Sequence, residues 1–357
     1  MTFLRNTWYV AAWANEVEPG AMLARRYLNE GVVLFRDADG VPVALQDRCP
    51  HRFAPLHMGR LKDGVVECGY HGLQFDGRGA CVLNPHGDGE IAHHAKVKTY
   101  PLEERHEALW IWMGEPELAD AALIPDFGMV IDPALRTVRG YLHAPSNYEL
   151  MTDNLLDLGH TAYLHPATLG SQAIVNSTRT NTREGDSVVY ELWAPDGEAP
   201  MVTQIMMPRY MGQRVDHWMT SRWYAPGLIH QETGTTLAGA PRAEGDVLQG
   251  VHWLTPETES TTHYFNALSR TFRMDEPQID ALIEAGTKQA FTQEDFPMVG
   301  AIQDEIGAVD IMSLRPVILS IDRGAIMARN IMRQKLKAEA AAASPSASSD
   351  VLAAADA

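Results

Sequence analysis

Two short groups of metal-binding side chains lie close together in the sequence. Cys49 and His51 form the first group, Cys68 and His71 form the second, and residues 52–67 separate them. Two thiolates and two imidazoles supplied by two turns are the ligands of a [2Fe–2S] cluster in which histidines replace the cysteines on one iron. Because neutral imidazoles leave the cluster less negative, it accepts an electron at a higher potential than an all-cysteine cluster.

Two alternatives compete with this cluster: a zinc ion, and no metal at all. A structural zinc site usually pairs cysteine with cysteine and histidine with histidine. Here each turn carries one residue of each type, which suits two irons bridged by sulfide. The repeated pairing of cysteine with histidine therefore favours the iron–sulfur cluster.

A second metal site is predicted from two histidines further along the chain. Asp157, His160 and His165 lie in the segment 148–165, whose apolar residues recur with a helical period. On an unbroken helix His165 would lie about 140° around the axis from His160, too far to share a metal ion. Pro166 disfavours helical backbone at His165, so we expect the helix to break there and His165 to turn back. One carboxylate would then complete the facial triad that binds Fe(II).

Asp295 is the predicted carboxylate. A helix is expected over residues 277–306, with Asp275 as its N-cap and an interruption at Pro297. Asp295 lies on the apolar stripe of this helix, where a carboxylate must be paired or bound to a metal. The other members of the stripe are Phe291, Met298 and Ile302. Glu294 lies off the stripe and is expected in solvent. The alternative role of Asp295 is an N-cap for the segment that begins at Pro297.

The elements that position these residues change in character along the chain. Residues 1–48 and 108–113 read as short strands separated by turn signals, which indicates an all-β domain. Both cysteine–histidine groups are expected at one tip of this domain. Residues 88–95 read as an exposed loop that keeps His93 and His94 in solvent. The turn-rich segment 114–128 marks a domain boundary. Residues 187–270 return to an alternating strand pattern.

Composition excludes several classes of protein. The 357 residues are 45% hydrophobic and contain no apolar run long enough to cross a bilayer, and the N-terminus lacks a signal pattern, so a cytoplasmic location is expected. Three cysteines, two of them assigned to the cluster, rule out a disulfide framework. The net charge of −17 argues against nucleic acid or an anionic membrane as partner.

The motifs CPHRFAPL (49–56) and CGYHGLQFD (68–76) resemble the Rieske domain of Rieske non-haem iron oxygenases. The resemblance is to the vanillate O-demethylase oxygenase group, which includes enzymes similar to dicamba monooxygenase. FLRNTWYVAAW near the N-terminus and TPETE at 255–259 resemble the same group, and the likeness extends to about residue 335. Leu73 departs from the pattern, since many members carry tryptophan after YHG. This is a packing position, so the cluster is not put in doubt.

The resemblance implies an α+β fold with three parts. Residues 1–115 would form an all-β Rieske [2Fe–2S] domain, and residues 116–336 a catalytic domain with an antiparallel sheet of the helix-grip (START-like) type. Residues 337–357 have a low-complexity composition and are expected to be disordered.

The resemblance also implies the activity of a terminal monooxygenase component. Fe(II) at His160, His165 and Asp295 would activate O₂, with electrons from NAD(P)H. Because no G-x-G-x-x-G motif follows a strand, a separate flavin and iron–sulfur reductase must deliver those electrons. The expected substrate is an aromatic acid such as vanillate or another methoxybenzoate, whose hydroxylated methoxy carbon leaves as formaldehyde. Alternatives are ring or methyl hydroxylation, and a Rieske electron carrier without a second iron.

Further residues receive roles from the same resemblance. Asp157 would not bind iron but would bridge His71 of one subunit to His160 of the next in a homotrimer. Its alternative role is a hydrogen-bond acceptor for His160 within one chain. Asn154, one turn earlier, is expected close to the iron. Three residues in predicted strands could hold a substrate carboxylate or could equally be surface or core residues: His230, His252 and Arg222.

Overall fold

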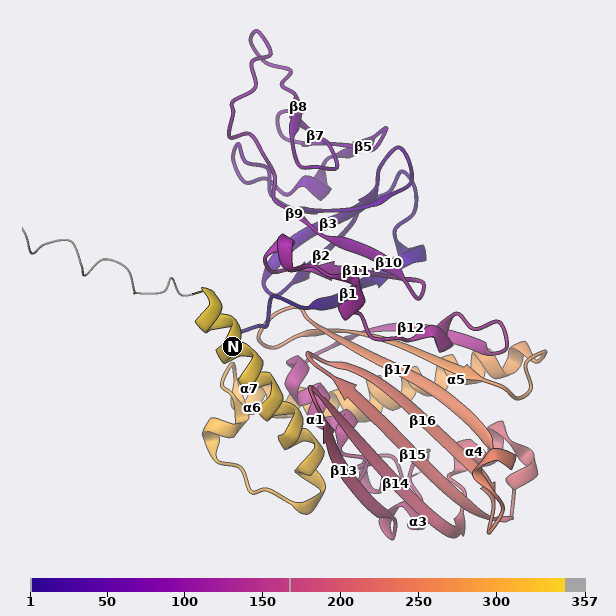
Figure 1. The fold of residues 1–357 in the computed structure, drawn as a ribbon. Helices are drawn as coiled ribbons and strands as arrows, with labels where there is room; N and C mark the ends of the chain where they lie inside the picture. The colour runs from indigo at the N-terminus through magenta and orange to yellow at the C-terminus, as the bar shows by residue number, and fades with distance from the viewer. Residues whose placement is uncertain (1, 167, 344–357) are drawn as a thin grey trace, which may run out of the picture.

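The computed structural model describes residues 2–166 and 168–343. Its first part is all β, as predicted, and contains three small antiparallel sheets (Figure 1). The first sheet orders its strands β1 (Trp8–Trp13), β11 (Ala108–Trp112), β10 (Leu102–Arg105). The second orders them β2 (Leu23–Tyr27), β3 (Glu30–Arg36), β4 (Pro42–Gln46), β9 (Thr99–Tyr100). The third, at the far tip, consists of β5 (Arg60–Lys62), β6 (Val65–Glu67), β7 (Gln74–Phe75), β8 (Cys81–Leu83).

The second part is built on one seven-stranded antiparallel sheet. Six strands follow one another as neighbours, because short connections favour antiparallel pairing, and β12 joins the free edge of β18. The strand order is β12 (Arg136–Ala144), β18 (Thr262–Arg270), β17 (Asp246–Pro256), β16 (Leu228–Leu237), β15 (Arg214–Tyr224), β14 (Ser187–Glu198), β13 (Thr178–Glu184). The sheet and its helices confirm the predicted α+β architecture.

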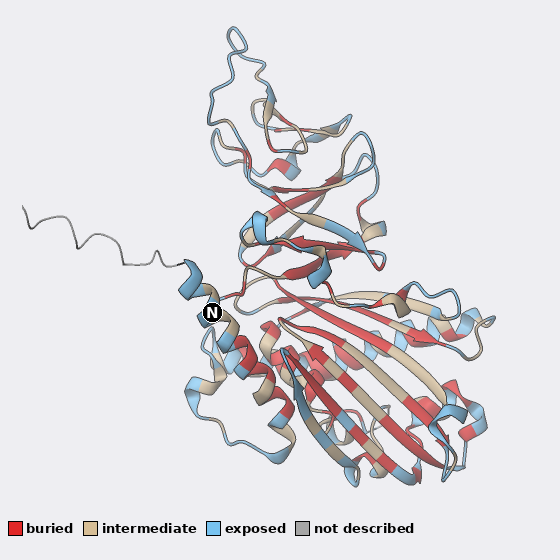
Figure 2. Ribbon diagram, in the orientation of Figure 1, coloured by how far each residue is buried: buried red, intermediate tan, exposed pale blue. Residues whose placement is uncertain are grey.

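The two faces of this sheet have different partners, because alternate side chains of a strand point to opposite faces. On one face, Val251, Trp253 and Phe265 join a buried cluster with Trp13 and Trp110 of the N-terminal sheet. Helices lie on the other face (Figure 1), and a cavity described below lies between them and the sheet. Burial follows this division, with buried bands along the middle strands and exposed residues at the outer loops (Figure 2).

The helices next to the predicted iron ligands His160 and His165 lie on the second face of the sheet. The predicted helix 148–165 is in fact two helices, α1 (Tyr148–Leu156) and α2 (Thr161–Leu164), because Asp157 leaves helical backbone at φ −104°, ψ 90°. His165 also leaves it, at φ −117°, ψ 43°, which confirms the break expected before proline. Two short helices follow: α3 (Gln172–Val175) and α4 (Met201–Met206).

The C-terminal helices correct three predictions. The N-cap of α5 (Pro277–Gln289) is Glu276 rather than Asp275. Pro297 does not interrupt the helix, since α5 passes through a π-helical turn, Ala290–Asp295, into α6 (Phe296–Ile306), whose first turn tolerates proline. The disorder predicted from residue 337 is wrong up to Ala343, because α7 (Arg323–Ala343) is continuous and the Glu339 carboxylate accepts bonds from backbone N–H groups of Arg5 and Asn6. Residues 344–357 lie outside the described range.

Arg329 fixes α7 to the helix that precedes the second predicted metal site. Its guanidinium is 6% exposed and pairs with Asp153 at 2.7 Å and Glu149 at 2.8 Å, both on α1. Burial raises the pKa of both carboxyl groups, and the guanidinium opposes that rise. Among the described residues, no helix is both long enough and apolar enough to cross a bilayer.

We predict that Arg329→Met lowers the free energy of unfolding by about 3 kcal/mol at pH 8, because two half-buried carboxylates lose their buried partner. Without the guanidinium their pKa values rise further above those of the unfolded chain, so the loss should shrink as pH falls toward 5. Urea unfolding at both pH values measures this. Arg333→Met, an exposed change on the same helix, is the control and should stay within about 0.5 kcal/mol. A loss that grows as pH falls would contradict the buried-pair explanation.

Candidate active site

The two cysteine–histidine groups lie on matching turns at the tip of the N-terminal domain. In each turn the cysteine carbonyl accepts the backbone N–H four residues later: Phe53 to Cys49 at 2.9 Å and Gly72 to Cys68 at 2.9 Å. Both of those later residues have positive φ, 60° at Phe53 and 74° at Gly72. The backbone therefore reverses tightly in each turn and brings the cysteine and the histidine of that turn close together. Two equivalent turns therefore present two pairs of donors to one space.

The four donors separate by burial. Cys49 and Cys68 are each 2% exposed and contact each other, and burial raises the pKa of the Cys49 thiol to about 11. His51 and His71 lie nearer the surface, with ring centroids 4.6 Å apart. Paired buried sulfurs beneath paired outer imidazoles fit a cluster with one cysteine-bound and one histidine-bound iron. Leu73 packs against the core beside the cysteines, as expected for a packing position.

The second predicted site also assembles. One ligand atom each from His160, His165 and Asp295 lie within 4.8 Å of one another. Asp295 Oδ1 is 3.5 Å from His160 Nε2 and 3.2 Å from His165 Nε2. Asn154, on α1, donates from Nδ2 to the same oxygen over 2.9 Å, which places it beside the triad as expected.

The electrostatics of Asp295 fit a metal ligand. The residue is 3% exposed, and although burial raises its pKa, hydrogen bonds from His160, His165 and Asn154 lower the pKa to about 2. Its side chain makes no cap bond to the following helix, so the alternative N-cap role is excluded. A buried, ionised carboxylate facing two imidazoles is the donor set of a 2-His-1-carboxylate iron site.

Glu294 is not free in solvent, which corrects the prediction. Its carboxylate accepts a hydrogen bond from His165 Nδ1, on the ring edge opposite Asp295, and Thr168 Oγ1 donates to it over 3.4 Å. Such a partner fixes the tautomer and orientation of a metal-binding histidine. The cause of the error is the π-helical turn, which rotates the residues around it relative to a regular helix. The buried positions of α6 are accordingly Phe296, Val299 and Gln303, and the predicted Met298 is exposed.

Asp157 lies between the two helices α1 and α2, half-buried. Its carboxylate Oδ1 accepts the backbone N–H of Gly159 over 2.8 Å. His160 Nδ1 donates to the main-chain carbonyl of Asp157, not to its carboxylate. The alternative role of the carboxylate as acceptor for His160 within one chain is therefore not what the geometry shows, and one carboxylate oxygen is left for another partner.

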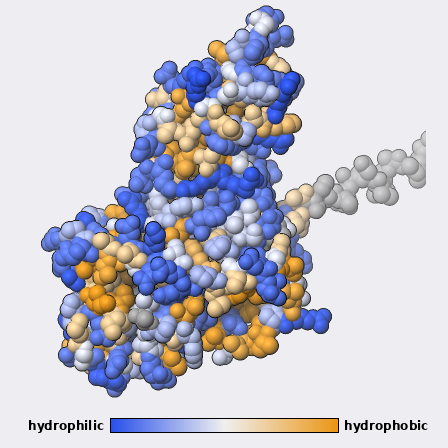
Figure 3. Space-filling view, turned by 180° about the vertical axis from the view of Figure 1, so that it is seen from behind, coloured by the Kyte–Doolittle hydropathy of each residue, from blue (hydrophilic) through white to orange (hydrophobic). Residues whose placement is uncertain are grey.

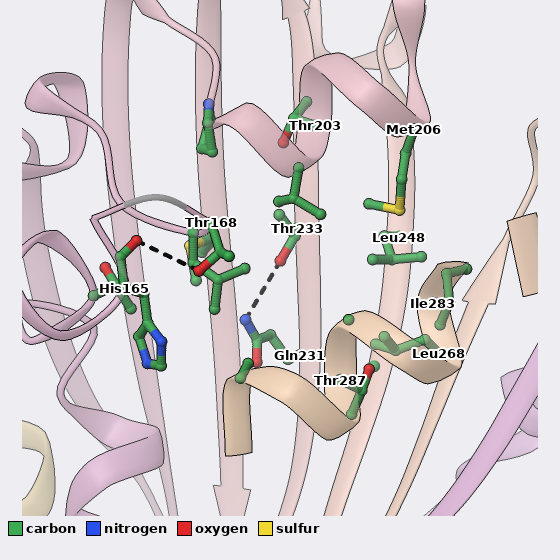
Figure 4. A pocket seen from close by; sticks show the side chains of 18 of the residues that line it. His165, Thr168, Thr203, Met206, Gln231, Thr233, Leu248, Leu268, Ile283 and Thr287 are labelled. Carbon is green, nitrogen blue, oxygen red and sulfur yellow. Dashed lines mark hydrogen bonds between the residues drawn. The ribbon is translucent and has the colours of Figure 1, made fainter. Parts of the chain in front are cut away.

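A cavity of about 390 Å³ opens from the triad between the sheet and the helices α4 and α5 (Figure 4). Odd-numbered residues of β15 and β16 and even-numbered residues of β17 and β18 line its sheet side. His252 belongs to this set, with Nε2 2.9 Å from Gln231 Oε1 and Nδ1 2.6 Å from the hydroxyl of Tyr264. Among the three predicted substrate residues, His252 alone lines the cavity.

The other two predicted substrate residues lie on the opposite face of the sheet. His230 follows the even-numbered positions of β16 and bonds Gln249 at 2.6 Å. Arg222 pairs across the strands with His230 and forms an ion pair with Glu184 at 2.6 Å. Neither lines the cavity, and neither is carried into the proposals below. Their location in strands was expected. Which face of the sheet a side chain occupies changes from one residue to the next, however, and the composition of a strand does not reveal which alternate set faces the cavity.

Sequence reasoning missed Gln231 and His217, which line the cavity from neighbouring strands. Their positions follow from the pairing of β15 with β16, in which His217 lies opposite Thr235. The His217 Nδ1 atom forms a hydrogen bond with the Thr235 hydroxyl at 2.9 Å. The alternation within each strand was visible in the sequence, but the register between strands was not.

Comparisons with known proteins match both parts of the chain. Residues 7–101 match the Rieske [2Fe–2S] domain model, and residues 144–338 match the model of the vanillate O-demethylase oxygenase C-terminal domain. Neither match includes residues 102–143, so the boundary expected at residue 116 stays a prediction.

Individual relatives span nearly the whole chain. The oxygenase component of chloroacetanilide N-alkylformylase from Rhizorhabdus wittichii is 41% identical over 94% of this chain and 97% of that protein. The oxygenase component of dicamba O-demethylase from Stenotrophomonas maltophilia is 40% identical over 96% of this chain and 100% of that protein. The crystal structure of dicamba monooxygenase bound to 3,6-dichlorosalicylic acid superposes with a TM-score of 0.90 at 39% identity, covering 96% of this chain and 100% of that one.

The paired turns, the buried triad and these matches agree with one another. The chain belongs to the Rieske non-haem iron oxygenases, in the group that carries the vanillate O-demethylase oxygenase C-terminal domain.

Proposed function

We propose that this protein is the terminal oxygenase component of a multicomponent monooxygenase that O-demethylates or hydroxylates an aromatic substrate. The observation that carries the proposal is the triad of His160, His165 and Asp295 at the end of a mostly apolar cavity. An electron carrier needs no second metal site and no cavity beside it, so these features argue against that alternative. The relatives named above are oxygenase components that act on aromatic compounds.

The donors fit two groups. Cys49, Cys68, His51 and His71 would hold a Rieske [2Fe–2S] cluster, and the triad would hold Fe(II). When bound, the cluster supplies single electrons and the ferrous ion supplies oxygen activation at its open positions. The protein would receive its electrons from NAD(P)H through a separate flavin and iron–sulfur reductase.

The chain's own residues have three tasks in this reaction. Glu294 orients the His165 ring through Nδ1, and the Asp157 carbonyl orients the His160 ring, so both Nε2 atoms point to one position. Asn154 donates to Asp295 Oδ1 and holds that carboxylate in place. Apolar side chains of α4, α5 and the sheet exclude water around the reacting methoxy carbon, which limits unproductive loss of electrons to solvent.

Electron delivery is proposed to occur between subunits. Within one chain the cluster turns lie at the far tip of the N-terminal domain, whereas α1 lies in the catalytic domain, beyond the other sheets of the N-terminal domain (Figure 1). The tip carries exposed apolar side chains at Phe53, Met58 and Tyr70, and the catalytic domain carries others at Tyr163 and Val317. A head-to-tail homotrimer would cover both sets and bring one subunit's tip to the next subunit's triad.

The test of the proposed function is reconstitution with a class-matched reductase, NADH and a panel of methoxylated aromatic compounds. We expect formaldehyde release that requires O₂, together with about three irons per chain, two from the cluster and one from the triad. About two irons per chain and no product with any compound would instead support the electron carrier.

His71→Cys should retain an iron–sulfur cluster but lower its reduction potential, because a thiolate adds negative charge where an imidazole is neutral. Redox titration followed by visible absorbance measures the change. His93→Cys is the matched control, since it places the same side chain in an exposed loop of the same domain. An unchanged potential in His71→Cys would show that His71 does not bind the cluster.

A further inference from the structure

His86 lies beside the second cluster turn and bonds its backbone. The Nε2 atom of His86 is 2.8 Å from the main-chain carbonyl oxygen of His71, and the two rings lie edge to face with centroids 6.1 Å apart. A carbonyl oxygen can only accept a hydrogen bond, so Nε2 carries a proton and donates it. The corresponding carbonyl of His51, in the first turn, accepts no hydrogen bond from the residues that the structure describes. The two turns, otherwise alike, therefore differ by this contact.

The loop that carries His86 has no hydrophobic core of its own. Residues 85–94 are all exposed. Seen from behind, the outermost end of the N-terminal domain is mainly hydrophilic (Figure 3). Burial of apolar side chains therefore cannot fix the shape of this loop, and its hydrogen bonds have to do so.

Asn84 supplies bonds that close the loop. Its Oδ1 accepts the backbone N–H of His86 at 3.1 Å, and its Nδ2 donates to the carbonyl of Glu90 at 2.8 Å. The backbone N–H of Gly89 also donates to the His86 carbonyl at 3.0 Å, and Gly89 has a φ of 81°. An asparagine that bonds the backbone two residues later is typical of a tight turn. These bonds hold His86 in one place although the residue is exposed.

The loop also packs directly against the second cluster turn. A Cβ atom at Gly72 would lie 3.2 Å from Pro85 Cγ, so the two segments approach each other closely. The loop therefore contacts two successive residues of the turn, the carbonyl of His71 and the backbone of Gly72. Contacts at two adjacent positions restrict the backbone from which the His71 ring projects.

A cavity of about 420 Å³ lies between this loop and the cluster turns. Its lining includes the two outer cluster histidines, His51 and His71, together with His86 and Ile91 from the loop. The loop thus forms one wall of the approach to the outer imidazoles. A displacement of the loop would change both this approach and the position of His71.

We propose that His86 is a positioning residue for the cluster: its Nε2–H bond to the His71 carbonyl fixes the backbone and the ring of this ligand. An outer partner that orients a metal ligand also tunes the metal centre. The consequence for electron transfer rests on the proposed oxygenase function. A fixed His71 ring keeps its outer nitrogen within hydrogen-bond reach of Asp157 of the partner subunit, to which His51, without such a contact, has no assigned connection.

Pulsed EPR of the reduced cluster tests the proposal, because the nitrogen couplings of the two ligand histidines depend on the orientation of each ring. His86→Leu keeps a side chain of similar size but removes the donor. We expect the couplings of one histidine to change and those of the other to stay. The equilibrium constant for reduction of the cluster should fall about 2- to 10-fold, because one N–H dipole no longer stabilises the added negative charge. Redox titration followed by visible absorbance measures this fall.

Three further variants interpret the result. His86→Gln retains an N–H donor of similar reach, so it should restore both the couplings and the potential. Asn84→Ala leaves the imidazole in place but removes two bonds of its loop, so it should shift both readouts in the direction of His86→Leu. His93→Leu is the matched control, because His93 is exposed in the same loop and does not line the cavity; both readouts should stay unchanged.

Unchanged couplings and potential in His86→Leu, at full cluster content, would overturn the proposal. If His86→Leu does not assemble the cluster, Asn84→Ala decides by the same criterion. Equal changes in His93→Leu, or no restoration in His86→Gln, would also overturn it, because the effect would then not come from the N–H bond. Failure of the oxygenase function would look different: the unmodified protein would form no product with any compound, while the couplings would still respond to His86→Leu.

Discussion

Asp295→Asn is expected to empty the mononuclear iron site and to lower product formation by more than about 100-fold, because losing only an outer partner of a metal ligand already costs about 10- to 100-fold. The change removes one negative charge from a buried group that faces two histidines at 3.2 and 3.5 Å. The Rieske absorbance should be unaffected, since none of its four donors lies near this helix. Iron analysis with visible absorbance separates the two sites.

Two further variants interpret that result. Glu294→Gln keeps the triad but weakens the partner of His165, so we expect iron affinity to fall by about 10- to 100-fold while some turnover remains at saturating iron. Asp304→Asn removes the same charge from an exposed position on α6 and should change neither iron content nor turnover. If Asp295→Asn retained full iron content and activity, a different carboxylate would be the ligand.

The cluster turns could be predicted from sequence because their chemistry is local. Two donors within each tight turn, with Gly72 supplying a positive φ, specify the geometry without reference to distant parts of the chain. The second site was harder, because Asp295 meets His160 and His165 only after the sheet and helices have formed. Its burial was visible as a stripe, but the π-helical turn that brings Glu294 to His165 was not.

The residues that line the cavity beside the triad were the least predictable part of the site. Arg222 and His230 lie in strands, as expected, yet they face away from the cavity, whereas Gln231 faces into it. Neighbouring residues of a strand point to opposite faces of the sheet, so a shift of one residue decides whether a side chain faces the cavity. The face is determined by the pairing between strands and by which side of the sheet the N-terminal domain covers. Neither quantity is contained in a window of sequence. The chain therefore specified its cofactors far more clearly than its substrate.

Asp157→Asn is expected to lower turnover by more than about 100-fold while both metal sites stay occupied and substrate binding stays nearly unchanged. In this chain the Asp157 carboxylate makes one bond, to the N–H of Gly159, and an asparagine Oδ1 can keep it. The contact from His160 goes to the main-chain carbonyl and also survives. The second carboxylate oxygen is replaced by the amide nitrogen, which is a hydrogen-bond donor. The amide nitrogen therefore cannot accept an N–H from His71 of the partner subunit.

The effect should therefore appear only in transfer between subunits. After chemical reduction of the cluster, mixing with O₂ and substrate should reoxidise it slowly in Asp157→Asn and rapidly in the unmodified protein, at equal iron content. Light scattering should give the mass of a trimer for both proteins, since a single buried contact at the junction does not hold a large interface together. A fully active monomer would contradict the trimer, and rapid reoxidation in the variant trimer would contradict the bridge, because the carboxylate would then be dispensable for electron transfer from the partner's His71 to His160.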